Sequence, residues 1–454
     1  LILTISFAFL QPVNLKEAAK NLAIASLDRV ALWKKIRDID RDPKYVVDEQ
    51  IVLEQDPIIF TEKLIYKRGE KIVINLLGRN EFQLEVNYVN PKDLEKNIIS
   101  RYKIQPRGSI PTVYSTLSGI QSTDQKIILD ASKLPNGWIN IVASNKETIL
   151  RQVPVFIEED KNSQIYFVDS TDTLLAYNPA HDVYGIPNYY SRLSNLSHSA
   201  SLPKNMPIEY KQIDSNTKSN ILCSDHLINS DILQRNNLYK LGINHSTMSD
   251  AALDDYSNLE GVKVLILGTH NEYWTKQKAI NIKKFVKKGG KLLILGGNNA
   301  WREVYRIQNS NRIFHGEGLR DDNDFNTLAE EILGSYYSRE DYNSYAPYKT
   351  KNSQYWKKYF DIDIEEGEDF AIGTNLEHCK DLIFGGSGHE TDKIIPNSKG
   401  FVELAKGKNK NGGASIVYKE FPGGGKVLNF GSLSTWHSLD DKILNKLIKT
   451  FVNK

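Results

Sequence analysis

The sequence is poor in the features that mark several specialised protein classes. Its two cysteines, Cys223 and Cys379, lie far apart and lack CxxC spacing, so they indicate neither a disulfide framework nor a zinc knuckle. The apolar run at residues 1–10 is too short to cross a membrane as a helix. It fits either the apolar part of a clipped signal peptide or a buried strand, which leaves both a cytoplasmic and an exported protein open.

An excess of charge of one sign is also missing. The chain has 58 basic and 56 acidic residues, which gives a formal net charge of +2. Such a balance creates no strong field that would attract nucleic acid or anionic lipid. We therefore expect neither nucleic acid nor a membrane among the partners.

The motifs of several large enzyme classes are absent. No GxGxxG follows a predicted strand, and GxxxxGK[ST], GxSxG and HExxH do not occur. The turn Gly296-Gly297-Asn298 has no cysteine that would serve as a nucleophile. No spacing singles out a Ser/His/Asp triad. The sequence therefore does not indicate a dinucleotide-binding protein, a P-loop nucleotide hydrolase, a hydrolase with a nucleophile elbow or an HExxH metalloprotease.

The hydrophobic pattern divides the chain into three parts, and 454 residues are too many for one ordinary core. Residues 1–56 predict a helical arm, with a helix at 14–37, and a charged linker. Residues 57–160 alternate with a period of two, which predicts an Ig-like β-sandwich. Its strands are expected at 71–77, 82–88, 126–129, 138–143 and 153–157. Residues 161–454 predict an α/β domain with an insertion at about 305–372.

The clearest unit of the third part is residues 261–302. Its apolar runs Val264–Leu267 and Leu292–Leu295 lack alternation, as parallel strands covered on both faces do. Between them, apolar positions recur at helical spacing, and Gly289-Gly290 ends the helix. The pattern places six lysines of this helix in solvent: Lys276, Lys278, Lys283, Lys284, Lys287 and Lys288. Further elements are expected as a strand at 165–168, helices at 231–241 and 440–452, and a hairpin at 414–430.

Two groups of oxygen and imidazole side chains lie where strands are predicted to end. They are His270, Glu272 and Tyr273, and then His389, Glu390 and Asp392. Strand ends of one parallel sheet converge, so these groups are expected at one edge. Carboxylate and phenol oxygens suit a hard cation, ferric iron above all, while imidazole would also suit zinc or iron(II). The alternative is that both histidines are hydrogen-bonded loop residues and that Tyr273 caps the sheet.

Four segments of the third part carry recognisable motifs. They are GTHNEYW at 268–274, the Gly296-Gly297-Asn298 turn with Trp301-Arg302, TLLAYN at 173–178 and GSLSTW at 431–436. The last two are similar to TWQAYN-type and GSIxW-type segments. Together these motifs resemble the C-terminal domain of the N,N-dimethylformamidase large (beta) subunit family, over residues 163–454.

The resemblance implies a flavodoxin-like, class I glutamine amidotransferase-like parallel sheet that follows the sandwich. It also implies hydrolysis of a small tertiary amide by mononuclear Fe3+ held by two tyrosines and a glutamate. By motif position, Tyr273 matches one iron tyrosine, and Glu390, in a Gly-x-Glu-x-Asp-like loop, matches the glutamate.

The second iron tyrosine has no anchored match in the sequence. The segment around His245 lacks the Tyr-x-Thr-Asp pattern that the resemblance leads us to expect. Three candidates therefore stay open: Tyr239, Tyr184 and Tyr177.

The resulting hypothesis is a metal-dependent hydrolase that acts on the C–N bond of a small amide. The candidates for moving the proton are His270, Glu272 and His389. The candidate substrate-binding residues are Asn298, Arg302 and Asn178. Besides the amide, a small subunit or a homo-oligomer stays open as a partner. The alternatives are a non-catalytic amidotransferase-like domain that binds a carbohydrate or a protein partner, and a hydrolase with another metal or bond.

Overall fold

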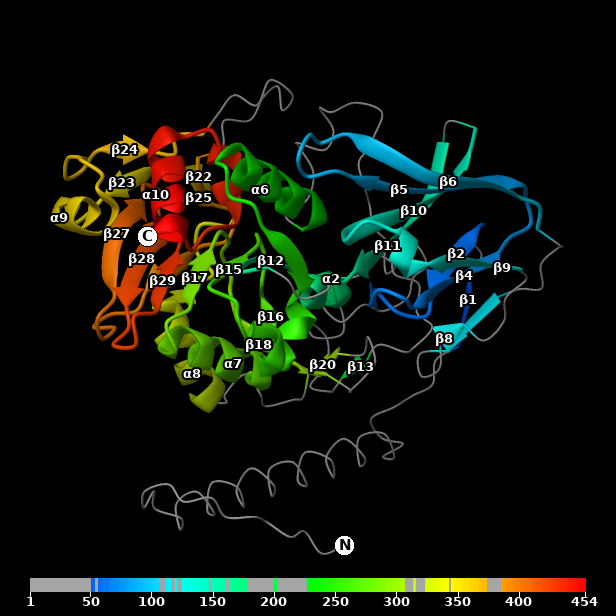
Figure 1. Cartoon of the computed structure of the whole chain (residues 1–454), viewed down its shortest axis with the longest axis horizontal. Coiled ribbons are helices and arrows are strands. Elements are labelled where there is room, and N and C mark those ends of the chain that lie inside the picture. Colours follow the sequence, from blue (N-terminus) through cyan, green and yellow to red (C-terminus); the bar gives the residue numbers. More distant parts are fainter. Residues whose placement is uncertain are drawn as a thin grey trace, which may run out of the picture. The chain divides into compact units, whose positions relative to one another are not determined.

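The computed structural model describes the residues 50–53, 56–106, 112–115, 119–120, 125–146, 148–159, 163–177, 200–201, 227–306, 313–315, 323–342, 344–373 and 385–454. These ranges belong to one compact unit, Gln50–Lys454 (Figure 1). The predicted helix at 14–37 and both cysteines lie outside the described residues. Within these ranges, no helix has the length and apolar character needed to cross a membrane.

Two sheets in the first half of this unit share one apolar core. Their strand orders are β3-β11-β10-β5-β6 and β2-β4-β9. The bounds are β2 (Ile58–Thr61), β3 (Ile65–Tyr66), β4 (Lys71–Leu77), β5 (Phe82–Val89), β6 (Lys96–Ile104), β9 (Gln125–Asp130), β10 (Gly137–Asn145) and β11 (Thr148–Ile157). The pairings are antiparallel except that of β3 with β11. The five strands predicted in this part are confirmed.

The alternation of apolar and polar residues along these strands places the apolar side chains in this core. In β5, Phe82, Leu84 and Val86 are buried, while Gln83 between them is exposed. The buried residues join apolar side chains of β4 and β11 in one cluster. The structure differs from the prediction at the end of residues 1–56, where a charged linker was expected. Gln50–Leu53 form strand β1, which pairs with β7 (Thr112–Ser115).

The second half of the unit is built on a nine-stranded sheet, with the order β14-β12-β15-β17-β29-β28-β27-β23-β24. The bounds are β12 (Ile165–Asp169), β14 (Ser246–Ser249), β15 (Val264–Leu267), β17 (Lys291–Ile294), β23 (Tyr348–Thr350), β24 (Asp369–Phe370), β27 (Val402–Gly407), β28 (Ser415–Glu420) and β29 (Lys426–Asn429). Neighbours from β14 to β29 are parallel, and neighbours from β29 to β24 are antiparallel.

The prediction of a flavodoxin-like parallel sheet is therefore wrong, because the sheet is mixed. A short turn joins β28 to β29, and so short a connection permits only an antiparallel pair. The hairpin predicted at 414–430 is thus confirmed, and it begins the antiparallel half. Two further antiparallel strands, β23 and β24, come from the segment predicted as an insertion at about 305–372.

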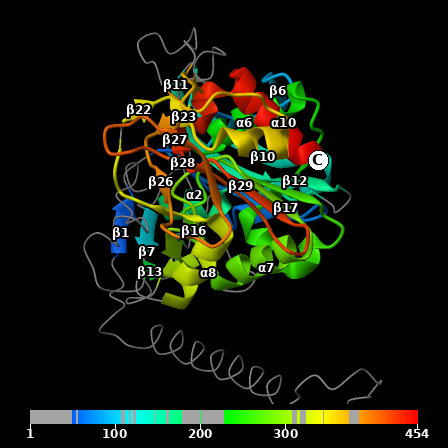
Figure 2. The same ribbon diagram turned by 90° about the vertical axis from the view of Figure 1, so that its left-hand side faces the viewer.

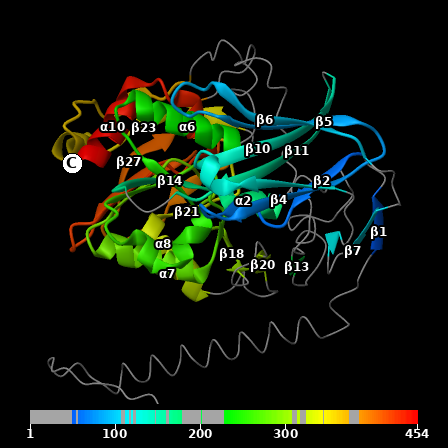
Figure 3. The ribbon, with the colours of Figure 1, turned by 45° about the vertical axis from the view of Figure 1, so that its right-hand side comes forward.

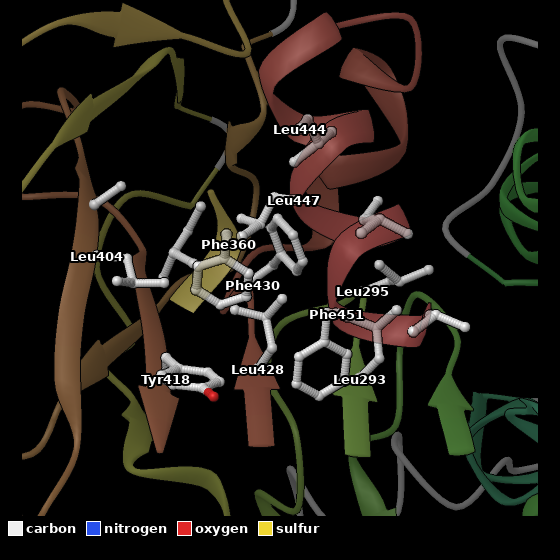
Figure 4. Close-up of a cluster of buried hydrophobic side chains, with 14 of the residues drawn as sticks. Leu293, Leu295, Phe360, Leu404, Tyr418, Leu428, Phe430, Leu444, Leu447 and Phe451 are labelled. Atoms are coloured by element: carbon white, nitrogen blue, oxygen red, sulfur yellow. The ribbon is translucent and has the colours of Figure 1, made fainter. Parts of the chain in front are cut away.

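Helices cover both faces of this sheet, as Figures 2 and 3 show. On one face lie α6 (Ile228–Lys240) and α10 (Lys442–Asn453), and on the other lie α7 (Lys276–Lys287) and α8 (Asn323–Leu333). In Figure 4, Leu447 and Phe451 of α10 pack near Leu293 and Leu428 of the strands. Each such fully buried side chain stabilises the fold by about 1.5–3 kcal/mol.

The predicted strand, helix and strand at 261–302 are confirmed. β15 and β17 pair in parallel, and α7 runs between them. The side chain of Thr275 accepts a hydrogen bond from the backbone N–H of Lys278 and so caps the start of α7. Gly289, with a φ of 102°, follows its end.

Candidate functional site

Four segments meet at the carboxyl edge of the parallel strands. β12 is followed by α2 (Thr171–Tyr177), and β15, β17 and β29 are followed by loops. Beyond the sheet, β16 (Tyr273–Trp274) pairs in parallel with β18 (Arg302–Glu303), and His270 forms a bridge with Gly297. The motif-bearing loops expected at this edge are therefore neighbours. The TLLAYN motif lies in α2 and the residue that follows this helix, Asn178.

Two glycines allow these loops to come close. A Cβ atom at Gly296 would lie 1.8 Å from the carbonyl oxygen of Thr269. At Gly297 it would lie 2.7 Å from the carbonyl oxygen of Glu390. Real Cβ atoms do not approach backbone atoms so closely, so only glycine fits at these positions.

His270 stands between two carboxylates. Its Nε2 lies 3.3 Å from Oε2 of Glu272 and 3.4 Å from Oε2 of Glu390. The hydroxyl of Tyr177 donates to the same oxygen of Glu272 over 2.5 Å. Nδ2 of Asn298 donates to Oε2 of Glu390 over 2.8 Å. We call these five residues the carboxylate–imidazole cluster; four of them were candidates from the sequence, and Tyr177 was one of three open choices.

The two carboxylates set the protonation of His270. Burial alone would lower the pKa of this imidazole, but the hydrogen bonds and charges of Glu272 and Glu390 outweigh burial and raise it to about 9. His270 therefore holds its proton at neutral pH. A group in this state suits the donation of a proton rather than its removal from a substrate.

Tyr273, which is fully buried, lies beside Tyr177. The two ring centroids are 5.9 Å apart, and the rings meet edge to face. Burial first, and then the charge of Glu272, raise the pKa of Tyr177 above its usual range. In the protein alone, this phenol therefore keeps its proton.

The other two candidate tyrosines do not join this pair. The ring of Tyr239 stacks on His245 with a centroid distance of 4.3 Å, and its hydroxyl donates to the carbonyl oxygen of His245. Tyr184 lies outside the described residues. Tyr177 is thus the candidate that the described structure brings to Tyr273.

His389 faces aromatic side chains. Its Nδ1 lies 3.2 Å from the hydroxyl of Tyr345, and the ring of Tyr342 is 5.3 Å away. Burial lowers the pKa of His389, so the imidazole is neutral at pH 7 and able to accept a proton. No sequence signal distinguishes Tyr342 and Tyr345, since they lie in a long polar segment with many tyrosines.

The candidate substrate-binding residues are placed as follows. Asn298 belongs to the carboxylate–imidazole cluster. Nε of Arg302 lies 4.0 Å from Oε1 of Glu272, and its guanidinium carbon is 5.3 Å from the centre of the Trp301 ring. Asn178 lies outside the described residues.

Asp392 connects the loop of Glu390 to the Asn298 turn. Its Oδ1 accepts the backbone N–H of Asn298 over 2.8 Å, and its Oδ2 accepts Nδ2 of Asn299 over 3.2 Å. Asn298 has a φ of 50°, a left-handed conformation that asparagine adopts more readily than most residues. Burial raises the pKa of Asp392 to about 6. The sequence grouped Asp392 with the possible ligands, and the structure gives it the role of an anchor.

Lys278 of α7 is buried and contacts the segment that carries Tyr273. Nζ of Lys278 lies 2.9 Å from a carboxylate oxygen of Asp172 and of Asp250, and 3.3 Å from the carbonyl oxygen of Tyr273. Arg306 pairs with Asp172 as well. The prediction that Lys278 lies in solvent is wrong, because these carboxylates compensate its charge inside the protein.

The donor set at this edge suits a hard cation. It offers the phenol oxygens of Tyr177 and Tyr273 and the carboxylates of Glu272 and Glu390, which are ligand types that hard ions prefer. Within the described ranges, no group of three or more His, Cys, Asp and Glu side chains is arranged to hold a metal ion. A metal here would therefore depend on the phenols, and a phenolate at neutral pH would need the charge of that cation.

The fold and the site define a protein in which two sheets with a common core are followed by a mixed sheet that carries acidic, imidazole and phenol groups at its edge. The model of the family described as N,N-dimethylformamidase beta subunit-like, C-terminal, matches residues 131–447. The chain belongs to this family, as the motifs predicted. Membership supports a hydrolase-like function.

Comparisons beyond the family are distant. None of the curated proteins compared with the chain matches it. A structure described as the mmIFT52 N-terminal domain is 18% identical, with a TM-score of 0.30, and the match covers 48% of this chain and 86% of that one. A cycloisomaltooligosaccharide glucanotransferase of Paenibacillus sp., complexed with cycloisomaltoheptaose, is 10% identical with a TM-score of 0.17, over 62% of this chain and 36% of that one. TM-scores this low do not define a common fold.

Proposed function

We propose that the protein is a metal-dependent hydrolase that cleaves the C–N bond of a small amide. The observation that carries this proposal is the position of His270 between Glu272 and Glu390, with the hydroxyl of Tyr177 on the same oxygen of Glu272. His270 and Glu272 lie in the loop after β15, Tyr177 ends α2, and Glu390 comes from a third segment. The three segments meet at a buried edge of the sheet. Family membership adds support for hydrolytic chemistry.

Tyr273, Tyr177 and Glu390 would hold a ferric ion. Tyr273 and Glu390 follow from the motifs, and Tyr177 is supported by the contact of its ring with Tyr273. When bound, the ion would supply a Lewis acid that polarises the carbonyl oxygen of the amide.

The protein groups then have distinct tasks in the proposed reaction, in which water adds across the C–N bond. His389 is neutral and would accept a proton from the attacking water. His270 holds a proton at neutral pH and would give it to the leaving amine nitrogen, while Glu272 and Glu390 keep its imidazole in place. Arg302 and Asn298 would orient the substrate.

The test combines metal analysis with a substrate panel. Protein purified from iron-supplemented medium should contain iron, absorb visible light through a phenolate-to-iron band and release amine from small formamides or acetamides. Tyr273→Phe and Glu390→Gln should lower all three readouts. Tyr336→Phe is the control, because this tyrosine is 42% exposed.

Colourless, iron-free protein that releases no amine from any amide in the panel would overturn the proposal. A Tyr273→Phe variant that still binds a carbohydrate or protein ligand with unchanged affinity would favour the non-catalytic alternative.

A further inference from the structure

One side chain of the first two sheets reaches the end of β12, the second strand from one edge of the nine-stranded sheet. The indole Nε1 of Trp138, in β10, donates to Oδ1 of Asp169 over 2.9 Å, and both side chains are buried. Asp169 is the last residue of β12. Gly137 precedes Trp138 with a φ of 91°, and a Cβ atom there would lie 3.1 Å from the guanidinium of Arg235. The glycine thus lets the start of β10 approach α6.

β12 leads directly into the helix that carries Tyr177. Only Ser170 separates Asp169 from α2, which has seven residues and is therefore about 10 Å long. Tyr177 is its last residue, and the hydroxyl of Tyr177 donates to Glu272. Less than two turns of helix therefore separate the end of β12 from Tyr177.

Apolar packing joins the same elements. One core cluster contains Trp138 and Phe156 from the first half, Leu174 and Leu175 from α2, and Tyr273 from the site. Figure 1 places α2 between β12 and β11. The match to the family begins at residue 131, so it includes β10 with Trp138 but not strands β2 to β9.

We infer that Trp138 is a positioning residue for the proposed reaction. It holds the end of β12 through Asp169 and thereby sets the place of Tyr177 beside Tyr273 and Glu272. It acts through Asp169 and α2 rather than by touching the reacting atoms. This inference rests on the proposed function, because Tyr177 has a chemical task only in that reaction. The strands β10 and β11 are then part of the active site's support rather than a separate recognition module.

The test is Trp138→Phe, which removes the indole N–H but keeps an aromatic ring in the core. We expect kcat for amide hydrolysis to fall about ten- to a hundredfold, since small displacements of catalytic groups have effects of this size. KM should change far less. At saturating iron, the phenolate-to-iron band should shift or weaken.

Trp356→Phe is a matched control. Trp356 is also buried, donates Nε1 to a buried acceptor, the carbonyl oxygen of Leu404, and meets Phe370 edge to face. Trp138 meets Phe156 in the same way. Trp356 belongs to a different core cluster, so its variant should lose similar stability and keep kcat and the band.

The inference is overturned if Trp138→Phe has the kcat and the phenolate-to-iron band of the wild type. It is also overturned if Trp138→Phe and Trp356→Phe lose kcat to the same extent. Hydrogen exchange of the peptide that covers α2, measured without metal, separates this result from a failure of the proposed function. If the wild-type protein shows neither iron nor amide hydrolysis, the proposed function fails. Faster exchange of α2 in Trp138→Phe but not in Trp356→Phe then still supports the structural part of the inference, that Trp138 holds α2 in place, and unchanged exchange overturns that part as well.

Discussion

The hydroxyl of Tyr177 donates a hydrogen bond to Oε2 of Glu272 over 2.5 Å, although the two residues are 95 positions apart in the chain. The contact exists because β12 and β15, the strands that precede them, are parallel neighbours. Nε2 of His270 lies 3.3 Å from the same oxygen. One carboxylate oxygen is thus shared by a phenol and an imidazole, and the strand order of the sheet brings them together.

The first prediction concerns this shared oxygen. Tyr177→Phe removes the phenol, so we expect the phenolate-to-iron band to weaken and amide hydrolysis to fall about a hundredfold. The lost hydrogen bond to a carboxylate should lower the free energy of unfolding by about 1.5–3 kcal/mol. Tyr239→Phe is the control, because its hydroxyl donates to a backbone oxygen away from the cluster. If Tyr177→Phe and Tyr239→Phe change the absorption spectrum and the rate of amine release to the same extent, Tyr177 is not an iron ligand.

The second prediction concerns the buried lysine of α7. Lys278→Met leaves the carboxylates of Asp172 and Asp250 without their ammonium partner, which should cost about 3–5 kcal/mol of unfolding free energy. Lys283→Met, on the same helix, removes a surface pair with Glu331 and should cost less than about 1 kcal/mol. Denaturation in urea measures both values, and similar losses in the two variants would speak against the structural role of Lys278.

The third prediction concerns pH. Glu158 accepts the backbone N–H of Ser249, and burial raises the pKa of Glu158 from 4.5 to about 7. The folded state therefore binds this proton more tightly than the unfolded chain does. The stability that results is present below about pH 4.5 and is lost as the pH rises through 7. Glu158→Gln should match the wild type near pH 4.5 and be more stable at pH 8.

A carboxyl group with the opposite shift provides the control for this measurement. Burial works against ionisation of Glu85, but Lys96 and Arg101 outweigh it and lower the pKa of Glu85. The stability that ionised Glu85 contributes is present above the pKa that this carboxyl has in the unfolded chain, and it is lost as the pH falls. Glu85→Gln should therefore destabilise the protein more at pH 7 than at pH 4. A difference between Glu158→Gln and the wild type that stays constant between pH 5 and pH 8 would refute the prediction for Glu158.

The fourth prediction concerns the close approach of two loops. Gly296→Ala places a Cβ atom 1.8 Å from the carbonyl oxygen of Thr269, so the backbone must move. We expect a loss of at least about 3 kcal/mol of unfolding free energy, together with loss of iron binding. Gly242→Ala meets no atom within 4 Å and has only the strain of a φ of 76°, about 1–2 kcal/mol. A thermal midpoint for Gly296→Ala above that of Gly242→Ala would be inconsistent with this account.

The strand, helix and strand at 261–302 could be predicted because their signals are local. The apolar runs of β15 and β17 and the stop at Gly289 depend only on neighbouring residues. The antiparallel pair of β28 and β29 could be predicted as well, from the short turn between them, but the directions of β27, β23 and β24 could not. The apolar residues of a strand such as β27 fit a parallel or an antiparallel neighbour equally. The flavodoxin-like sheet was implied by the resemblance alone, and the antiparallel half contradicts it.

The site was predictable where a motif fixes a residue at a strand end, as for His270 and Glu272. It was not predictable where distant segments decide. Lys278 has the helical phase of the buried Ile282 and Phe285, but its charge led to the prediction of an exposed side chain. The carboxylates of Asp172 and Asp250, which compensate that charge, come from other segments and could not be assigned to it from the sequence. Tyr177 could not be chosen from three candidates because its place depends on α2, a helix whose first three residues are polar and give no helical signal.

The change of strand direction at β29 also bears on how the protein is made. Strands β27, β28 and β29 lie within residues 402–429, so their antiparallel pairing closes short loops, whereas pairing β12 with β15 brings together residues about a hundred positions apart. Local pairings form faster. β29 is also the neighbour of β17, so the parallel half cannot be completed until the ribosome has passed Asn429. The loop that carries His270 and the helix that carries Tyr177 therefore gain their final support only after strands β27, β28 and β29 have been synthesised.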